Sequence, residues 1–165
     1  MGMTKTRFFV HGTPKGQPRP RAYSRGGKAG VYDPKTADEW KAMVGWEARR
    51  HEFDAGQAPV QVTLQFWMPR PKSHYGAKGL KATAPRLHTA KPDSDNLAKG
   101  VLDMLTQMGY WRDDAQVVVL HVAKAYGKVP GCDVLVEVLG FPGTVPGAAA
   151  GANQGQIDAP AAETL

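Results

Sequence analysis

Cysteine and long apolar runs are scarce in this sequence. Its 165 residues include one cysteine, Cys132, which excludes an intrachain disulfide framework and a cysteine-based zinc cluster. No stretch approaches the roughly 18 apolar residues of a membrane-spanning helix, and the first residues lack the apolar segment of a secretion signal. We therefore expect a cytoplasmic protein built on an ordinary apolar core. A chain of about 150 residues buries enough surface to fold without a disulfide or a bound metal.

Acidic residues are missing from two basic stretches, residues 13–30 and residues 69–91. The whole chain carries 21 Lys and Arg against 15 Asp and Glu, a formal net charge of +6, which favours a polyanionic partner. Glycine and proline in the first stretch exclude regular structure, so we expect a loop there. Two acid-free loops predict contacts with nucleic-acid phosphates, the alternative being solubility alone. The candidate DNA-binding residues are Lys15, Arg19, Arg21, Arg25, Lys28, Lys72 and Lys91.

Basic residues are absent from residues 141–165, which are rich in Ala, Gly and Pro and contain two acids, Asp158 and Glu163. So few large apolar side chains do not offset the entropy cost of ordering a segment. We predict a disordered tail here and a folded domain over residues 1–140. Removing the two negative charges of the tail from the net +6 leaves +8 on that domain.

Period-two hydrophobicity predicts the strands. A β-rich run covers residues 7–11, and apolar residues fall on every second position over residues 60–68. Two Val-rich runs, residues 116–126 and 133–139, are joined by a short link with glycine and proline. Such a pair predicts an antiparallel hairpin.

Helical periodicity predicts two helices. Asp33 and Pro34 suit a helix start, and apolar residues recur at helical spacing up to about His51. A second helix is predicted over residues 96–108, where Gly109 supplies the stop. The order β-α-β-α-β-β predicts a single α+β domain with two helices on one face of a sheet of about four strands.

Four carboxylates stand out in this basic chain. Asp93 and Asp95 are two positions apart after Pro92, so an extended or turn-like segment directs both to one side. Asp113 and Asp114 follow a helix whose length returns the chain toward its starting edge, and we expect all four acids to converge near a sheet edge. Such a cluster repels itself unless a hard cation occupies it, and oxygen ligands favour Mg²⁺ or Mn²⁺.

These acids also have a structural interpretation. Asp95 stands where a helix N-cap belongs, and Asp93 suits a turn. At about 100° per residue, Asp95, Lys99 and Asp103 share one strip of the second helix. The strip is either a solvated face with i,i+4 ion pairs or the wall of a site, and the residues alone leave both interpretations open.

The run KPDSDNLAKGVLDML, followed by DDAQVVVLHVAK, resembles the signature of the RusA family of Holliday junction resolvases. The family pattern is Pro-Asp-x-Asp-Asn-Leu-x-Lys, then an Asp and a Leu on the helix, then Asp-Asp-x-Gln-Val and a later Lys. The resemblance covers roughly residues 7–139. The matching positions are Pro92, Asp93, Asp95, Asn96, Leu97, Lys99, Asp103, Leu105, Asp113, Asp114, Gln116, Val117 and Lys124.

The resemblance implies a Mg²⁺-dependent endodeoxyribonuclease of bacterial or prophage origin that resolves four-way DNA junctions by paired nicks in recombination and repair. It implies a homodimer acting on branched DNA, whose two-fold symmetry a C2 pair matches, with Mn²⁺ as a substitute metal and no organic cofactor. By the resemblance, Asp93, Asp95 and Asp114 are the metal-binding catalytic carboxylates, and Lys99 is the basic residue beside them. Asp113, Asp103 and Asn96 would support the site.

Two functions other than a Holliday junction resolvase remain open. One is a non-catalytic DNA-binding protein whose acids are structural caps. The other is a general metal-dependent nuclease on the same scaffold. Cleavage of a four-way junction, compared with a linear duplex in the presence and absence of metal, separates all three.

Overall fold

The computed structural model describes residues 4–18, 21–32 and 36–140. The predicted disordered tail, residues 141–165, lies outside the described residues, as does Arg19. None of the described helices combines the length and the hydropathy needed to cross a membrane.

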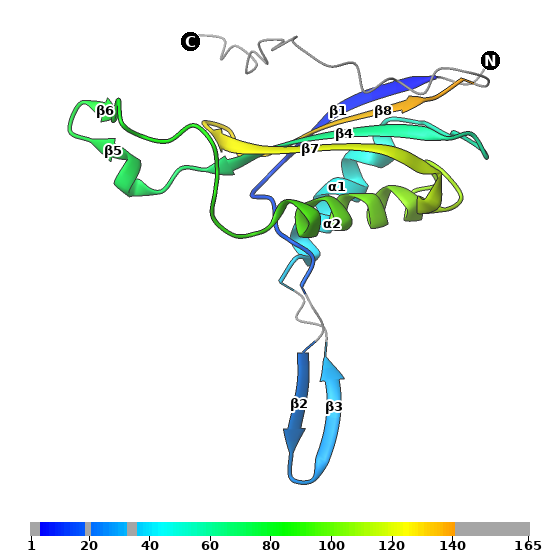
Figure 1. Cartoon of the computed structure of the whole chain (residues 1–165), viewed down its shortest axis with the longest axis horizontal. Coiled ribbons are helices and arrows are strands. Elements are labelled where there is room, and N and C mark those ends of the chain that lie inside the picture. Colours follow the sequence, from blue (N-terminus) through cyan, green and yellow to red (C-terminus); the bar gives the residue numbers. More distant parts are fainter. Residues whose placement is uncertain (1–3, 19–20, 33–35, 141–165) are drawn as a thin grey trace.

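Four strands form one mixed sheet in the order β1-β8-β4-β7 (Figure 1). Their bounds are β1 (Lys5–His11), β4 (Val60–Pro69), β7 (Val117–Gly127) and β8 (Gly131–Val138). β8 pairs antiparallel with both β1 and β4, whereas β4 and β7 are parallel. The prediction of a strand over residues 60–68 is confirmed, and this strand lies in the middle of the sheet.

Two helices, α1 (Asp38–Arg50) and α2 (Ser94–Gln107), cover the same face of the sheet (Figure 1). α1 packs against β1 and against α2, and α2 lies along β7. The predicted α+β class with both helices on one face is confirmed. The predicted helix start at Asp33 and Pro34 lies outside the described residues, and the described helix α1 begins at Asp38.

The two Val-rich runs do not form the predicted hairpin, because β4 lies between β7 and β8. Six of the ten residues of β4 are buried, and the strand is paired along both edges, with β8 on one side and β7 on the other. The link between β7 and β8 therefore passes the end of β4. A Cβ on Gly127 would lie 2.9 Å from the Cβ of Trp67, so the close approach requires a glycine there.

The first basic stretch contains a hairpin that the sequence analysis did not predict. β2 (Arg21–Arg25) and β3 (Lys28–Tyr32) pair antiparallel and extend away from the helices (Figure 1). Gly26 and Gly27 connect them with φ of 58° and 75°, the positive values that a two-residue hairpin turn of type I′ requires. The Gly-Gly pair was the overlooked signal.

The second basic stretch is mostly irregular, as predicted. It contains a short 3-10 turn, η1 (Lys72–His74), and a two-stranded arm of β5 (Tyr75–Gly76) and β6 (Gly79–Leu80). This arm also extends from the body of the domain (Figure 1).

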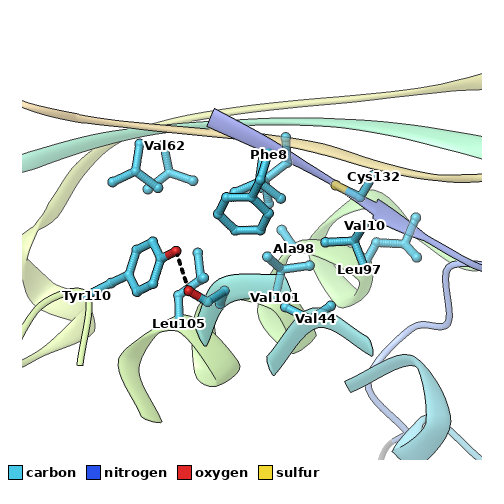
Figure 2. Packing of buried hydrophobic residues seen from close by; sticks show 14 of the residues in the cluster. Phe8, Val10, Val44, Val62, Leu97, Ala98, Val101, Leu105, Tyr110 and Cys132 are labelled. Carbon is cyan, nitrogen blue, oxygen red and sulfur yellow. Dashed lines mark hydrogen bonds between the residues drawn. The ribbon is translucent and has the colours of Figure 1, made fainter. Parts of the chain in front are cut away.

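The core lies between the sheet and the two helices (Figure 2). Phe8 and Val10 of β1 meet α2 side chains, among them Leu97 and Leu105. The hydroxyl of Tyr110 lies 3.0 Å from the carbonyl oxygen of Ala48 and so ties the end of α2 to α1. Burial raises the pKa of the Tyr110 hydroxyl, which therefore stays a neutral donor.

Candidate functional site

Asp93 and Asp95 lie where the chain enters α2. Asp93 is the N-cap residue, with extended φ and ψ of −72° and 152°, and its carbonyl accepts the first helical hydrogen bond from Leu97 N at 3.0 Å. Asp95 is already in the first helical turn, so the predicted extended segment is correct for Asp93 and wrong for Asp95. Both side chains are exposed. The partial positive charge of the helix N-terminus favours two carboxylates here.

Asp93 and Asp113 both precede a helical segment, but only one of them caps it with its side chain. The Asp93 side chain makes no capping hydrogen bond, although the residue occupies the cap position. Asp113, by contrast, caps the short 3-10 turn η2 (Asp114–Gln116): its Oδ1 accepts from Ala115 N at 2.7 Å. The structural interpretation therefore holds for Asp113, whereas the carboxylate of Asp93 is left without that role.

Lys124 connects β7 to the segment that precedes α2. Its Nζ donates to the carbonyl oxygens of Ala90 at 2.7 Å and Pro92 at 2.8 Å. These bonds hold the chain immediately before Asp93. The sequence analysis matched Lys124 as a motif position and assigned it no role. A single lysine in a strand of mostly apolar residues was the available signal.

His88 lies next to Lys124, and the sequence analysis left it out of the site. The His88 backbone N–H donates to the Lys124 carbonyl at 3.5 Å, and its imidazole packs edge-on against Tyr126. Burial, and then the charge of Lys124, lower the pKa of His88. The imidazole is therefore held neutral beside the lysine.

Residues 15–17 cross α2 at its first turns. Gln17 N donates to the carbonyl of Asn96 at 2.9 Å. A Cβ on Gly16 would lie 2.9 Å from the Cβ of Pro92, so the close approach depends on that glycine. This contact places the exposed Lys15 beside the beginning of α2, and it gives Asn96 a part in holding the basic stretch there.

The polar strip of α2 contains Asp95, Lys99 and Asp103. Lys99 is exposed and Asp103 is half-buried. The salt bridges of the described residues involve none of the three. The i,i+4 ion pairs that a solvated face would contain are thus not formed, which favours the other interpretation, the wall of a site.

Asp114 lies at the opposite end of α2 from Asp93. Lys124, late in β7, binds Pro92 at the start of α2, while η2, just before β7, contacts α2 as well. α2 carries the chain one way along the sheet and β7 carries it back. The helix has 14 residues, and at about 1.5 Å per residue it separates its two ends by about 20 Å.

The predicted convergence of four carboxylates is therefore not found within a single chain. Within residues 4–18, 21–32 and 36–140, no three Asp, Glu, His or Cys side chains gather closely enough to hold a metal ion. Gln116 fastens η2 where it is, since its Nε2 donates to the carbonyl of Ala58 at 2.9 Å. Asp114 stays exposed at that far end.

The carboxylates fit a hard divalent cation in their chemistry. Asp93, Asp95 and Asp114 are exposed, and none of them forms a side-chain hydrogen bond or salt bridge with another described residue. Their oxygens are the ligands that Mg²⁺ prefers. One chain places two of the three at the start of α2 and the third at its far end.

The candidate DNA-binding residues that the structure describes are on the surface. Lys15, Arg25, Lys28, Lys72 and Lys91 form no salt bridge within the described ranges. Arg19 lies outside those ranges, and Arg21 is placed only as part of β2. The exposed ones are Lys15, Arg25, Lys28, Lys72 and Lys91.

Comparison with known proteins covers most of this chain. The family model described as Endodeoxyribonuclease RusA matches residues 11–137. The uncharacterized protein YqaN of Bacillus subtilis (strain 168) is 37% identical over 135 residues, which are 79% of this chain and 94% of that protein. The matched range includes α2, η2 and β7, and with them every candidate catalytic residue. The chain belongs to the RusA endodeoxyribonuclease family.

Proposed function

We propose that this protein is a Mg²⁺-dependent endonuclease that resolves four-way DNA junctions by paired symmetric nicks in recombination and repair. The observation that carries the proposal is the start of α2 in a member of this endonuclease family. There Asp93 and Asp95 present carboxylates without a partner among the described residues, and the cations Lys15, Lys91 and Lys99 lie on the neighbouring turns and loops.

The charges of the site suit a phosphodiester substrate. Exposed lysines and arginines of the two basic stretches attract the DNA backbone and hold it by phosphate contacts. Asp93 and Asp95 alone would repel the scissile phosphate, and their carboxylate oxygens would hold Mg²⁺ at the start of α2. The proposed third ligand, Asp114, lies at the far end of that helix within one chain. When bound, Mg²⁺ reverses the local charge, polarises the phosphate and lowers the pKa of a water molecule.

Lys99 would stabilise charge in the transition state, and Lys124 would hold the backbone before Asp93. Lys99 follows Asp95 by one helical turn on the same strip, so its ammonium donates to a phosphate oxygen that gains negative charge in the transition state. Lys124 acts through its two bonds to Ala90 and Pro92, which fix the backbone that carries Asp93. No side chain has to form a covalent intermediate, because water is the nucleophile.

A single assay tests the proposal. A labelled four-way junction and a linear duplex of the same sequence are incubated with Mg²⁺ or with EDTA. Wild type is compared with Asp93→Asn, Asp95→Asn and the control Glu52→Gln, an exposed acid away from the site. We expect each Asp→Asn variant to lose about 100-fold or more in cleavage, as losing a group that stabilises transition-state charge does. Junction binding should be retained or tightened because repulsion is relieved.

Three outcomes would contradict parts of the proposal. Cleavage that persists in EDTA would overturn the metal requirement. Equal cutting of the linear duplex would favour a general metal-dependent nuclease. Binding without cleavage by wild type under every metal condition would favour the non-catalytic DNA-binding protein, in which Asp93→Asn changes only stability.

A further inference from the structure

We infer that the arm of β5 and β6 is a wedge for branched DNA. Tyr75 and Leu80 insert between bases that are unstacked at the branch point, and the lysines beside them bind the flanking phosphates. The ligand of the arm is thus a pair of nucleobases at a break in the base stack, which a junction has and a linear duplex lacks. The inference rests on the proposed function for the identity of the substrate.

Two large apolar side chains stand together on the arm. Tyr75 of β5 and Leu80 of β6 are direct partners in the antiparallel register, and direct partners share one face of a two-stranded ribbon. Tyr75 is 45% exposed and Leu80 is 50% exposed. Neither belongs to the apolar core of the described residues. The fold therefore leaves this apolar face in water, where a ligand that covers it gains free energy.

The ribbon is thin next to this pair. The adjacent partners are Gly76 and Gly79, which have no side chains. A Cβ on Gly79 would meet nothing within 4 Å, and a Cβ on Gly76 would meet only the side chain of Lys81, at 3.8 Å. Glycine in a strand often marks a place where a ligand or another backbone approaches closely. A thin ribbon with one apolar face fits a narrow gap, such as the space between two separated base pairs.

The charge around the pair selects DNA over an apolar protein or lipid surface. Residues 70–88 contain five Lys and Arg and no Asp or Glu. Lys72 and Lys78 lie on either side of Tyr75 in the sequence and are exposed, and the salt bridges of the described residues involve neither. Proteins that insert apolar side chains between base steps hold the neighbouring phosphates with such cations.

The base of the arm is fixed on the last residues of β7. Arg70 Nη1 donates to the carbonyl of Pro85 at 2.9 Å, which ties together the two chain segments that lead into the arm. The Arg70 guanidinium also lies over the ring of Tyr126, 5.3 Å from its centroid, and the imidazole of His74 packs edge-on against the same ring. Tyr126 N donates to the carbonyl of Arg86 at 2.9 Å. A base held in this way transmits the position of the arm to β7.

This base lies at the end of the sheet where α2 begins (Figure 1). Tyr126 follows Lys124 by two residues, and Lys124 Nζ donates to the carbonyl of Pro92 at 2.8 Å, directly before Asp93. The arm and the first carboxylate of the candidate site are therefore attached to the same stretch of β7. A branch point held by the arm is held at a set position relative to Asp93.

The length of the arm limits that position. Tyr75 follows Arg70 by five residues, and Leu80 precedes Arg86 by six. At no more than about 3.6 Å per residue, the pair stays within about 20 Å of the base. This is about six base pairs, at about 3.4 Å per pair. The wedge thus places the branch point within a few base pairs of the carboxylates.

The first experiment follows the bases at the branch point. A four-way junction with 2-aminopurine beside the branch point is titrated with protein in EDTA, so that cleavage has no part in the readout. Wild type should raise the fluorescence, because separated bases stack less. The double variant Tyr75→Ala, Leu80→Ala should lose more than half of the rise. Leu87→Ala, which removes a leucine that is 68% exposed at the base of the arm, should keep it. An undiminished rise in the double variant would overturn the inference.

The second experiment measures selectivity. Dissociation constants are determined in EDTA for the junction and for a linear duplex of the same sequence. The double variant should bind the junction about tenfold more weakly and the duplex as wild type does, because only the junction offers bases to stack on. Tyr75→Phe retains the ring and should bind like wild type. Equal weakening on both DNAs, or a Tyr75→Phe variant as weak as Tyr75→Ala, would overturn the inference.

The third experiment tests the lysines. Lys78→Gln should weaken binding to junction and duplex alike and should reduce the slope of log affinity against log salt concentration by about one, since one phosphate contact is lost. The 2-aminopurine signal at saturating protein should remain, because the wedge is intact. An unchanged salt slope would contradict the phosphate contact at the arm.

These readouts separate the wedge from the proposed function. Wild type that raises the fluorescence and prefers the junction, but does not cut it with Mg²⁺, would contradict the proposed nuclease and support the wedge. Wild type that cuts the junction, with a double variant that keeps full fluorescence and full selectivity, would contradict the wedge alone. Binding of the arm to another protein in place of DNA would also leave both DNA readouts of the double variant unchanged.

Discussion

The sheet has two edges of opposite chemistry. On β1, the Arg7 guanidinium donates to Asp133 of β8 at 3.1 Å and 2.5 Å, and the Lys5 ammonium lies 3.0 Å from Glu137. These charges alternate with buried residues such as Phe8. β7 instead exposes valine and leucine, and among the described residues it pairs with another strand of the sheet along one edge only.

The difference shows how well each edge strand is protected against pairing with another strand. Charged side chains on an edge strand oppose the approach of a second strand, because pairing would desolvate them. β1 has that protection, whereas β7 lacks it where its backbone groups are free. The same contrast bears on function, since α2, whose first turn carries Asp95, packs against β7.

The largest effect is expected from a substitution that disrupts the packing of β8 against β1. A Cβ on Gly131 would collide with the ring of Phe9 and with the carbonyl oxygen of Val10. A backbone atom cannot yield as a side chain can, so Gly131→Ala should lower the free energy of unfolding by about 3 kcal/mol. Denaturant titration measures it. Gly140→Ala, where the added methyl meets nothing within 4 Å, is the control; equal effects would show that β1 is not closely packed on β8.

The next largest effect is expected near the C-terminal end of β7, where Lys124 binds the segment before α2. Lys124→Met removes two hydrogen bonds from a charged donor and leaves the carbonyls of Ala90 and Pro92 unsatisfied. The expected loss is about 2 kcal/mol in the free energy of unfolding, with a fall in junction cleavage because Asp93 is no longer held. Lys128→Met, an exposed lysine just beyond β7, should change neither. Unaltered cleavage by Lys124→Met would remove its positioning role.

A smaller effect is expected for the salt bridge between Arg7 of β1 and Asp133 of β8. The Arg7–Asp133 pair is on the surface, with the Arg7 side chain 63% exposed, so its coupling energy should be only about 0.5 kcal/mol. A double-mutant cycle with Arg7→Gln and Asp133→Asn measures it at low and at high salt. The expected decrease with salt follows from screening. A coupling that salt leaves unchanged would argue for a buried pair, contrary to the structure.

The smallest expected effect is on stability at acidic pH, and it involves His88 beside β7. Burial, and then Lys124, lower the pKa of His88, so the folded protein binds its proton less readily than the unfolded chain does. The unfolded state therefore gains protons first as the pH falls below about 6.5, and stability decreases there. His88→Gln should reduce that decrease relative to wild type. Identical pH profiles of unfolding would contradict this account.

Local patterns predicted most of the elements. Alternation over residues 60–68 predicted β4, and the helical stripe after Asn96 predicted α2 to within two residues at its start. The β2–β3 hairpin was missed because the Gly26-Gly27 turn signal was outweighed by the surrounding glycine and proline. The predicted end of α1 at about His51 agrees with the last helical residue, Arg50.

The arrangement of β7 and β8 could not be predicted in the same way. A short link between two valine-rich runs favours a hairpin locally, and that prediction was wrong because β4 takes the place between them. Competition for a central position depends on all the strands at once. The same is true of the acids: their identity was apparent, but Asp114 was expected beside Asp93 and lies about a helix length away.

The sequence by itself determined the α+β class, the two basic stretches and the acidic motif of the RusA endodeoxyribonuclease family, because these depend on composition and on patterns a few residues long. Only the tertiary structure decided that α2 and β7 run in opposite directions, that Asp93 and Asp114 lie at opposite ends of α2, and that β7 is an edge strand with exposed apolar side chains. Strand order and direction depend on pairings between distant segments, and such pairings are selected by the burial of the whole sheet.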